Sequence, residues 1–325
     1  MTDGSEADLA PLAGEVTQLL EAARRGEVSE LASLSDWIRV GSGGMAAVYR
    51  ASTAGGEPVA VKMLHQVDLS PAGERRFARE CEIIQRLDHP NIVRQLGAAR
   101  SPSDRRFLIM QFVEGETLAR RLAEGRLRLD EALPLLRQLA AALDHAHERG
   151  VVHRDVKPAN VLLEIRDGAA PRVVLTDFGI AKVEGGTLLT GGNVMGTVAY
   201  MAPEQVRGAH EVDHRANVYA LGVVAYEMLT GSHPFPGRTM TAVLLAHLQR
   251  PPADPRLAAP ELPSTVARAL LRALRKEPDK RPQSAGAFVV ELIAGSALDD
   301  TVAERTLGPS DALDRGARGA VAAPT

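Results

Sequence analysis

The sequence predicts an α+β fold of two lobes, a small β-rich lobe followed by a larger, mostly helical lobe. Short β-like runs follow one another between residues 37 and 110, whereas helical periodicity dominates from residue 118 to residue 297. Two further β-like runs, at 161–165 and 172–175, interrupt the helices. A chain of 325 residues has room for about two domains.

The elements of each lobe follow from local patterns. Ser70 as N-cap and Pro71 in the first turn predict one helix in the small lobe. That helix is expected over 71–87, among strands at 37–40, 46–51, 59–63, 92–96 and 107–110. Residues 111–115 are the expected hinge. The large lobe should contain helices at 130–147, 218–230, 239–248 and 266–274.

The two ends of the chain are expected to lie outside this core. Residues 1–34 have helical spacing that Gly14 and Gly26 interrupt. They are either short amphipathic helices packed on the body or a regulatory arm. Residues 297–325 are small, polar and rich in alanine, which predicts a disordered tail.

Composition excludes several classes of protein. The chain is 45% apolar and 24% charged, as in soluble globular proteins, and its net charge of −3 argues against nucleic acid as a partner. A single cysteine, Cys81, excludes an intrachain disulfide. The sequence shows neither a transmembrane segment nor a secretory signal, so we expect a cytoplasmic protein.

A glycine-rich segment precedes one of the few lysines. Gly41 and Gly43 would let backbone amides approach a phosphate chain, although a plain glycine-rich turn is the alternative when they are taken alone. Only five of the 38 basic residues are lysines, and Lys62 ends a β-like run shortly after these glycines. Glu80 lies on the apolar stripe of the following helix, where a carboxylate needs a cation, and Lys62 is the natural partner.

A second cluster, at 153–160, concentrates polar groups between apolar runs. Asp155 suits a base that accepts the proton of a hydroxyl nucleophile or a group that orients this hydroxyl. Lys157 suits a contact with the phosphate that is transferred. Asn160 and the later Asp177 offer the hard oxygen ligands that Mg²⁺ prefers. Packing does not explain this order and spacing.

Together these motifs resemble the eukaryotic type of protein kinase, and their residues are most similar to those of the bacterial serine/threonine kinases. The resemblance covers about residues 36–296. It rests also on Met45 after paired glycines and on the segments 89–93, 113–118 and 196–205. It implies a kinase domain at 35–296, with an N-lobe at 35–110, a hinge at 111–115 and a C-lobe at 116–296.

The resemblance also implies ATP as substrate, Mg²⁺ as the metal, which Mn²⁺ could replace, and these site residues. Catalysis would fall to Asp155 and Lys157, with Lys62 held by Glu80 on the ATP phosphates. Asn160 and Asp177 would hold the metal. The nucleotide would also contact Val40, Gly41, Gly43, Val48, Ala60, Met110, Gln111 and Val113.

For substrate and regulation, the resemblance implies transfer to serine or threonine of proteins. Thr197 would have a structural role, as would a buried ion pair between Glu204 and Arg281. Asn217 stands where the family usually has an aspartate that accepts backbone hydrogen bonds from the 153–154 turn. The neutral amide should accept them more weakly, which predicts a working but less rigid catalytic loop.

Arg154 indicates activation through phosphorylation of the loop that follows Asp177. Thr187 and Thr190 are the candidate acceptors, Thr190 being favoured, and self-association would allow autophosphorylation. The alternative is that these threonines are ordinary loop residues.

Two other functions are alternatives to a protein kinase. A binding scaffold without catalysis would not need Lys62, Glu80, Asp155, Asn160 and Asp177 together. A small-molecule phosphotransferase would not need the segment 197–204, which resembles a floor for a substrate peptide.

Overall fold

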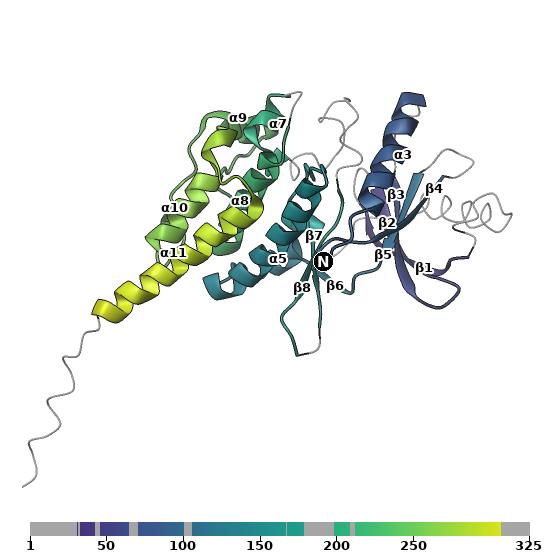
Figure 1. The fold of residues 1–325 in the computed structure, drawn as a ribbon, viewed down its shortest axis with the longest axis horizontal. Coiled ribbons are helices and arrows are strands. Elements are labelled where there is room, and N and C mark those ends of the chain that lie inside the picture. Colours follow the sequence, from purple (N-terminus) through teal and green to yellow (C-terminus); the bar gives the residue numbers. More distant parts are fainter. Residues whose placement is uncertain are drawn as a thin grey trace, which may run out of the picture.

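The structure, a computed structural model, contains the two lobes that the sequence predicts (Figure 1). It describes residues 31, 33–42, 46–64, 71–100, 106–166, 168–178, 198–208 and 212–306. The predicted sites Gly43, Thr187, Thr190 and Thr197 therefore lie outside the described residues, as does nearly all of the segment 1–34.

The small lobe is a five-stranded antiparallel sheet with one helix, α3 (Pro71–Gln85), between its third and fourth strands. The strand order is β1-β2-β3-β5-β4. The bounds are β1 (Ser35–Ser42), β2 (Ala46–Ser52), β3 (Pro58–Leu64), β4 (Gln95–Arg100) and β5 (Arg106–Gln111).

The strand β5, between β3 and β4, is buried on both faces, because a different apolar cluster covers each face. Phe107 and Ile109 belong to one cluster, whereas Leu108 and Met110 pack with Cys81 of α3 in the other. Leu31 belongs to the first cluster and is 2% exposed. A residue from the expected extension 1–34 thus forms part of the core of the small lobe.

The large lobe is built around α8 (Arg215–Thr230), in which every residue except Arg215 and Glu227 is buried. A helix that is apolar on all sides must be enclosed, and α5, α10 and α11 pack against it. The bounds of the other helices are α4 (Leu118–Ala123), α5 (Leu129–Glu148), α7 (Pro203–Val206), α9 (Met240–Gln249), α10 (Ser264–Ala273) and α11 (Ala285–Thr306).

A small antiparallel sheet lies where the chain enters the large lobe. Its strands β6 (Gly115–Thr117), β7 (Val161–Glu164) and β8 (Arg172–Leu175) occur in sequence order. Short 3-10 turns occur at Pro158–Asn160, Pro255–Leu257 and Pro278–Lys280. β6 was not predicted from the sequence, because three residues beside a hinge are too few for a periodic signal.

One strand of the small lobe lies further along the chain than predicted. We expected it at 92–96, but β4 is Gln95–Arg100. The backbone of 91–93 pairs with the large lobe instead: Val93 N–H donates to Leu175 O (2.9 Å), and Leu175 N–H donates to Asn91 O (2.8 Å). The apolar residues at 92 and 93 therefore join the lobes, while the small residues of β4 gave little strand signal.

The last helix extends beyond the predicted end of the kinase domain at residue 296. α11 continues to Thr306, into the segment that we expected to be a disordered tail. Residues 297–306 contain neither glycine nor proline, and Gly308 and Pro309 follow the helix end, so local propensity permits the extra turns. Among the described residues, no helix combines the length and apolar character needed to cross a membrane.

Candidate active site

The register of the small sheet places predicted nucleotide residues in one row. Gly41 pairs with Val48, Val48 pairs with Lys62, and Lys62 pairs with Leu108. Directly paired residues share a face of an antiparallel sheet. This row therefore lies on one face.

A neighbouring row on that face extends the candidate nucleotide surface. Ala60 pairs with Met110, and both residues are two positions from a member of the first row, so the strand alternation gives them the same face. Met110 is buried, Val113 is buried and Gln111 is half-buried, whereas Val40 is 50% exposed.

Lys62 reaches across to the large lobe. Its Nζ lies 2.7 Å from Oδ1 of Asp177, the second residue after β8. Asp177 has a φ of 63°, a conformation that non-glycine residues rarely adopt, so the surrounding structure must hold the backbone there. Glu80 is half-buried on α3. Its predicted contact with Lys62 stays a prediction.

The turn before Asp155 is held by His153, which is fully buried. Nε2 of His153 lies 2.9 Å from the carbonyl oxygen of Thr176, which can only accept a hydrogen bond, so Nε2 carries the proton. Nδ1 then accepts from the N–H of Asp155 (3.2 Å). One neutral imidazole thus connects the Asp155 turn to the residue that precedes Asp177.

Three side chains of the predicted catalytic cluster meet at one carboxylate. Lys157 Nζ lies 3.0 Å from Asp155 Oδ2, and Asn160 Nδ2 donates to the same oxygen (3.1 Å). Asn160 Nδ2 also donates to the carbonyl oxygen of Asp155 (2.8 Å). Since the amide nitrogen of Asn160 is engaged by Asp155, its amide oxygen is the atom that suits a metal ion. Asn160 Oδ1 and the carboxylate of Asp177 are hard oxygen donors and fit Mg²⁺.

Asn217 contacts the catalytic turn as predicted from its position. Its Oδ1 accepts from the N–H of Arg154 (3.0 Å). Its Nδ2 lies 2.9 Å from Nε2 of His147, so the amide supplies a donor that an aspartate would lack. Asn217 is 1% exposed, and both polar ends of its side chain have partners.

Gln205 makes a contact with the catalytic turn that was not predicted from the sequence. Its Nε2 donates to the carbonyl oxygen of Arg154 (3.1 Å), and its Oε1 accepts from Ala202 N–H (3.0 Å). This one side chain ties the segment 198–205 to the residue before Asp155. A glutamine after the Pro-Glu pair was visible in the sequence, but no local pattern indicated its partner.

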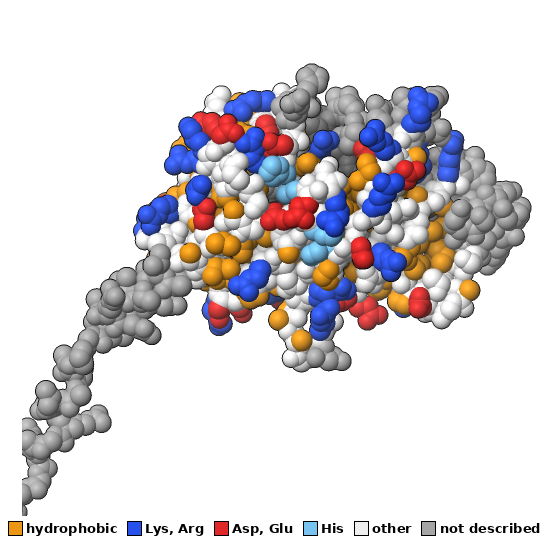
Figure 2. Space-filling view, in the orientation of Figure 1, with side chains coloured by type: hydrophobic (Ala, Val, Ile, Leu, Met, Phe, Trp, Pro, Cys, Tyr) orange, Lys and Arg blue, Asp and Glu red, His pale blue; other side chains and the backbone are white. Residues whose placement is uncertain are grey.

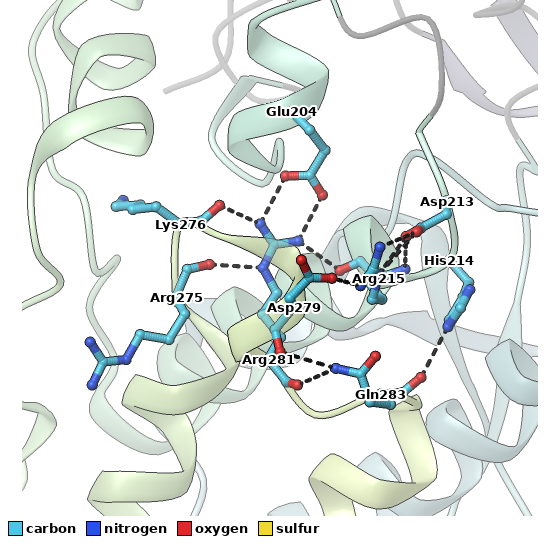
Figure 3. A network of polar contacts seen from close by, with 9 residues as sticks. All are labelled: Glu204, Asp213, His214, Arg215, Arg275, Lys276, Asp279, Arg281 and Gln283. Atoms are coloured by element: carbon cyan, nitrogen blue, oxygen red, sulfur yellow. Dashed lines mark hydrogen bonds and ion pairs between the residues drawn. The ribbon is translucent and has the colours of Figure 1, made fainter.

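Glu204 and Arg281 form the ion pair that the sequence predicts (Figure 3). Arg281 Nη1 and Nη2 lie 2.7 Å and 2.8 Å from the two carboxylate oxygens of Glu204. The guanidinium also donates to the carbonyl oxygens of Arg215, Arg275 and Lys276. Arg281 is 0% exposed, and this full set of partners compensates for burying its charge.

Surface charges of both signs alternate over the face that Figure 2 shows, and no patch of a single sign stands out on it.

Comparison with known proteins identifies the family. Residues 35–292 match the protein kinase domain. The chain is 41% identical over 254 residues to the serine/threonine-protein kinase Pkn1 of Myxococcus xanthus, which covers 77% of this chain and 36% of that protein. It is 38% identical over 251 residues to the serine/threonine-protein kinase PrkC of Bacillus subtilis, covering 76% of this chain and 38% of that protein.

Among solved structures, the fold is similar to that of Rad53 1-466 in complex with AMP-PNP. The TM-score is 0.65 at 27% sequence identity, covering 80% of this chain and 65% of that chain. This chain spans well under half the length of the two curated relatives. With the matched domain and the two lobes, the chain belongs to the protein kinase family, as a kinase similar to the bacterial serine/threonine kinases.

Proposed function

We propose that this protein transfers the γ-phosphoryl group of ATP to serine or threonine hydroxyls of proteins. The observation that carries the proposal is the meeting of Asp155, Lys157 and Asn160 at one carboxylate, in a lobe that Lys62 connects to the nucleotide face through Asp177. A scaffold does not require this convergence, and a small-molecule phosphotransferase, which would share it, does not need the segment 197–204.

In the proposed reaction, the Asp155 carboxylate accepts the proton of the substrate hydroxyl. The hydroxyl oxygen forms a bond to the γ-phosphorus while the bond from that phosphorus to the bridging oxygen breaks, and ADP leaves. Lys157 lies beside Asp155 and would offer its ammonium to the transferring phosphate. Lys62, positioned by Glu80, would contact the phosphates that remain on ADP.

We propose that Asn160 and Asp177 hold Mg²⁺, with Mn²⁺ as a substitute. The metal would neutralise charge on the phosphates. The face formed by Gly41, Val48 and Ala60, with Val40 above it, would cover the nucleotide. Met110, Gln111 and Val113 would form its inner edge.

We also propose regulation by phosphorylation in the segment that follows Asp177. Nε of Arg154 is buried and has no hydrogen-bond partner among the described residues, so it is a donor that a phosphate could use. Thr187 and Thr190 remain the proposed acceptors, with self-association for autophosphorylation. After incubation of the purified protein with Mg·ATP, phosphosite mapping should find phosphate on Thr190 or Thr187. A protein without phosphate in 179–197 would contradict this regulation.

A cytoplasmic location is part of the proposal. ATP and Mg²⁺ are supplied there, and Cys81 is buried and forms no disulfide.

The central test is the variant Asp155→Asn, which keeps the shape of the side chain and removes its basicity. We expect phosphate transfer from labelled ATP to a generic basic protein to fall at least about 100-fold, the usual size of a lost general base. Asp130→Asn is the matched control, because it removes the same charge from an exposed position on α5. Equal transfer by Asp155→Asn and Asp130→Asn would refute the proposed catalysis.

A further inference from the structure

A fully buried histidine joins the segment before α7 to two helices of the large lobe. His247 lies in α9 and is 0% exposed. Its Nε2 lies 2.8 Å from the carbonyl oxygen of Ala199, and its Nδ1 lies 2.8 Å from the hydroxyl of Tyr219 on α8.

The two contacts determine the protonation of the imidazole. The carbonyl oxygen of Ala199 has no proton to give, so Nε2 of His247 must be the donor. Burial, followed by the nearby His233 and Lys276, lowers the pKa of His247 to about 3. The ring is therefore neutral near pH 7, and Nδ1 accepts from the hydroxyl of Tyr219.

The backbone that His247 holds lies beside the catalytic turn. Gln205 ties the same segment to the carbonyl oxygen of Arg154, the residue before Asp155. Ala199 and Tyr200 are only partly buried, so part of this segment lies at the surface next to the Asp155 turn. A protein chain that presents a hydroxyl to Asp155 must run past such a neighbouring surface.

Other contacts also attach the segment to the large lobe, and the buried ring of His233 interacts with the backbone of Ala199 as well. Val198 and Met201 pack with Val243 of α9 in an apolar cluster. The hydroxyl of Tyr200 donates to Oε2 of Glu227 (2.6 Å). Apolar packing is non-directional, whereas the 2.8 Å hydrogen bond from His247 has a direction and orients the peptide group of Ala199.

We propose that His247 is a positioning residue for the protein substrate, whose Nε2–H orients the backbone of 198–202 beside Asp155. The inference rests on the proposed kinase function and names a residue outside the nucleotide site. It predicts that loss of the hydrogen bond from His247 raises KM for the protein substrate and leaves KM for ATP unchanged.

Two amide variants separate the bond from the bulk of the ring. The amide nitrogen of His247→Gln can reach the place of Nε2 and donate to Ala199. The shorter side chain of His247→Asn ends near the place of Nδ1 and cannot. Both variants remove the ring, so both should lower Tm by similar amounts.

The measurement is steady-state kinetics with myelin basic protein and with ATP varied in turn. We expect His247→Asn to raise KM for myelin basic protein about fivefold, the size of one neutral hydrogen bond. KM for ATP should stay at the wild-type value, and His247→Gln should restore KM for the protein substrate. Equal protein-substrate KM values in the two variants, or a parallel rise in KM for ATP, would overturn the proposal.

Tyr219→Phe tests the same bond from its other side, and covers the case in which His247→Asn does not fold. It keeps the ring that contacts Arg281 and removes only the donor to Nδ1, so the Ala199 carbonyl alone then holds the imidazole in its orientation. We expect a smaller rise in KM for myelin basic protein alone, and an unchanged KM would count against the proposal. Failure of the wild-type protein to phosphorylate any protein would refute the proposed kinase function instead.

Discussion

Asn217 shows how a single buried side chain sets the catalytic turn. The sequence predicted an acceptor for the 153–154 turn, and the structure contains that bond to Arg154 N–H. The partner of its amide nitrogen, Nε2 of His147, was not predicted, because no motif in the sequence indicated it. The neutral amide satisfies both neighbours at once, which gives a physical reason for asparagine at this position.

Two variants of Asn217 measure these bonds. Asn217→Ala removes the buried amide and leaves Arg154 N–H and His147 Nε2 without this partner. We expect it to lower the free energy of unfolding by about 2–4 kcal/mol and to lower kcat. Asn217→Asp keeps the acceptor for Arg154 N–H and adds charge but loses the donor to His147, so its Tm and kcat should exceed the Asn217→Ala values and differ from wild type. Urea unfolding and the kinase assay measure both. An Asn217→Asp protein identical to wild type in both respects would show that charge at this position does not matter.

At the scale of elements, the lobes are predictable where the periodicity is strong. The helices α5, α8, α9 and α10 begin and end within a few residues of their predicted ranges, because each has an apolar stripe or core long enough to read. β4 and β6 were misplaced or missed, since their partners rather than their own residues decide where they pair. Leu31 likewise shows that the small lobe uses residues before 35.

At Gly115, the absence of a Cβ atom allows β6 to pair with β7. It begins β6 with a φ of 155°, and a Cβ there would lie 2.0 Å from the carbonyl oxygen of Leu163 in β7. Gly115→Ala must therefore separate β6 from β7, and we expect a loss of more than about 2 kcal/mol of unfolding free energy. Gly97→Ala in β4 is the control, because its Cβ would meet only Ile109 Cδ1 at 3.9 Å. Equal Tm values for the two variants would contradict this reading of β6.

At the scale of the whole molecule, buried histidines make folding sensitive to acid. Burial lowers the pKa of His233 and of His247, the latter to about 3. Between about pH 6.5 and pH 3, residue 247 is protonated in the unfolded chain and neutral in the folded protein. Stability from this group is therefore complete above pH 6.5 and is lost as the pH falls through that window.

The prediction is a difference between wild type and His247→Gln. The wild-type free energy of unfolding should fall more steeply from pH 6.5 to pH 4.5, by up to about 1.4 kcal/mol per pH unit, because glutamine does not titrate. Urea unfolding at several pH values in this range gives both slopes. Parallel slopes would show that His247 is protonated in the folded protein at these pH values.

By itself, the sequence determined the order of the two lobes and the identity of the polar groups at 153–160 and 177, because short-range periodicity and motif spacing are local properties. Only the tertiary structure decided which of these groups meet. Lys62 and Asp177 are 115 residues apart and lie 2.7 Å from each other, and His247 reaches Ala199 across 48 residues. Such distances depend on how the helices and sheets pack, and no local pattern in the chain encodes them.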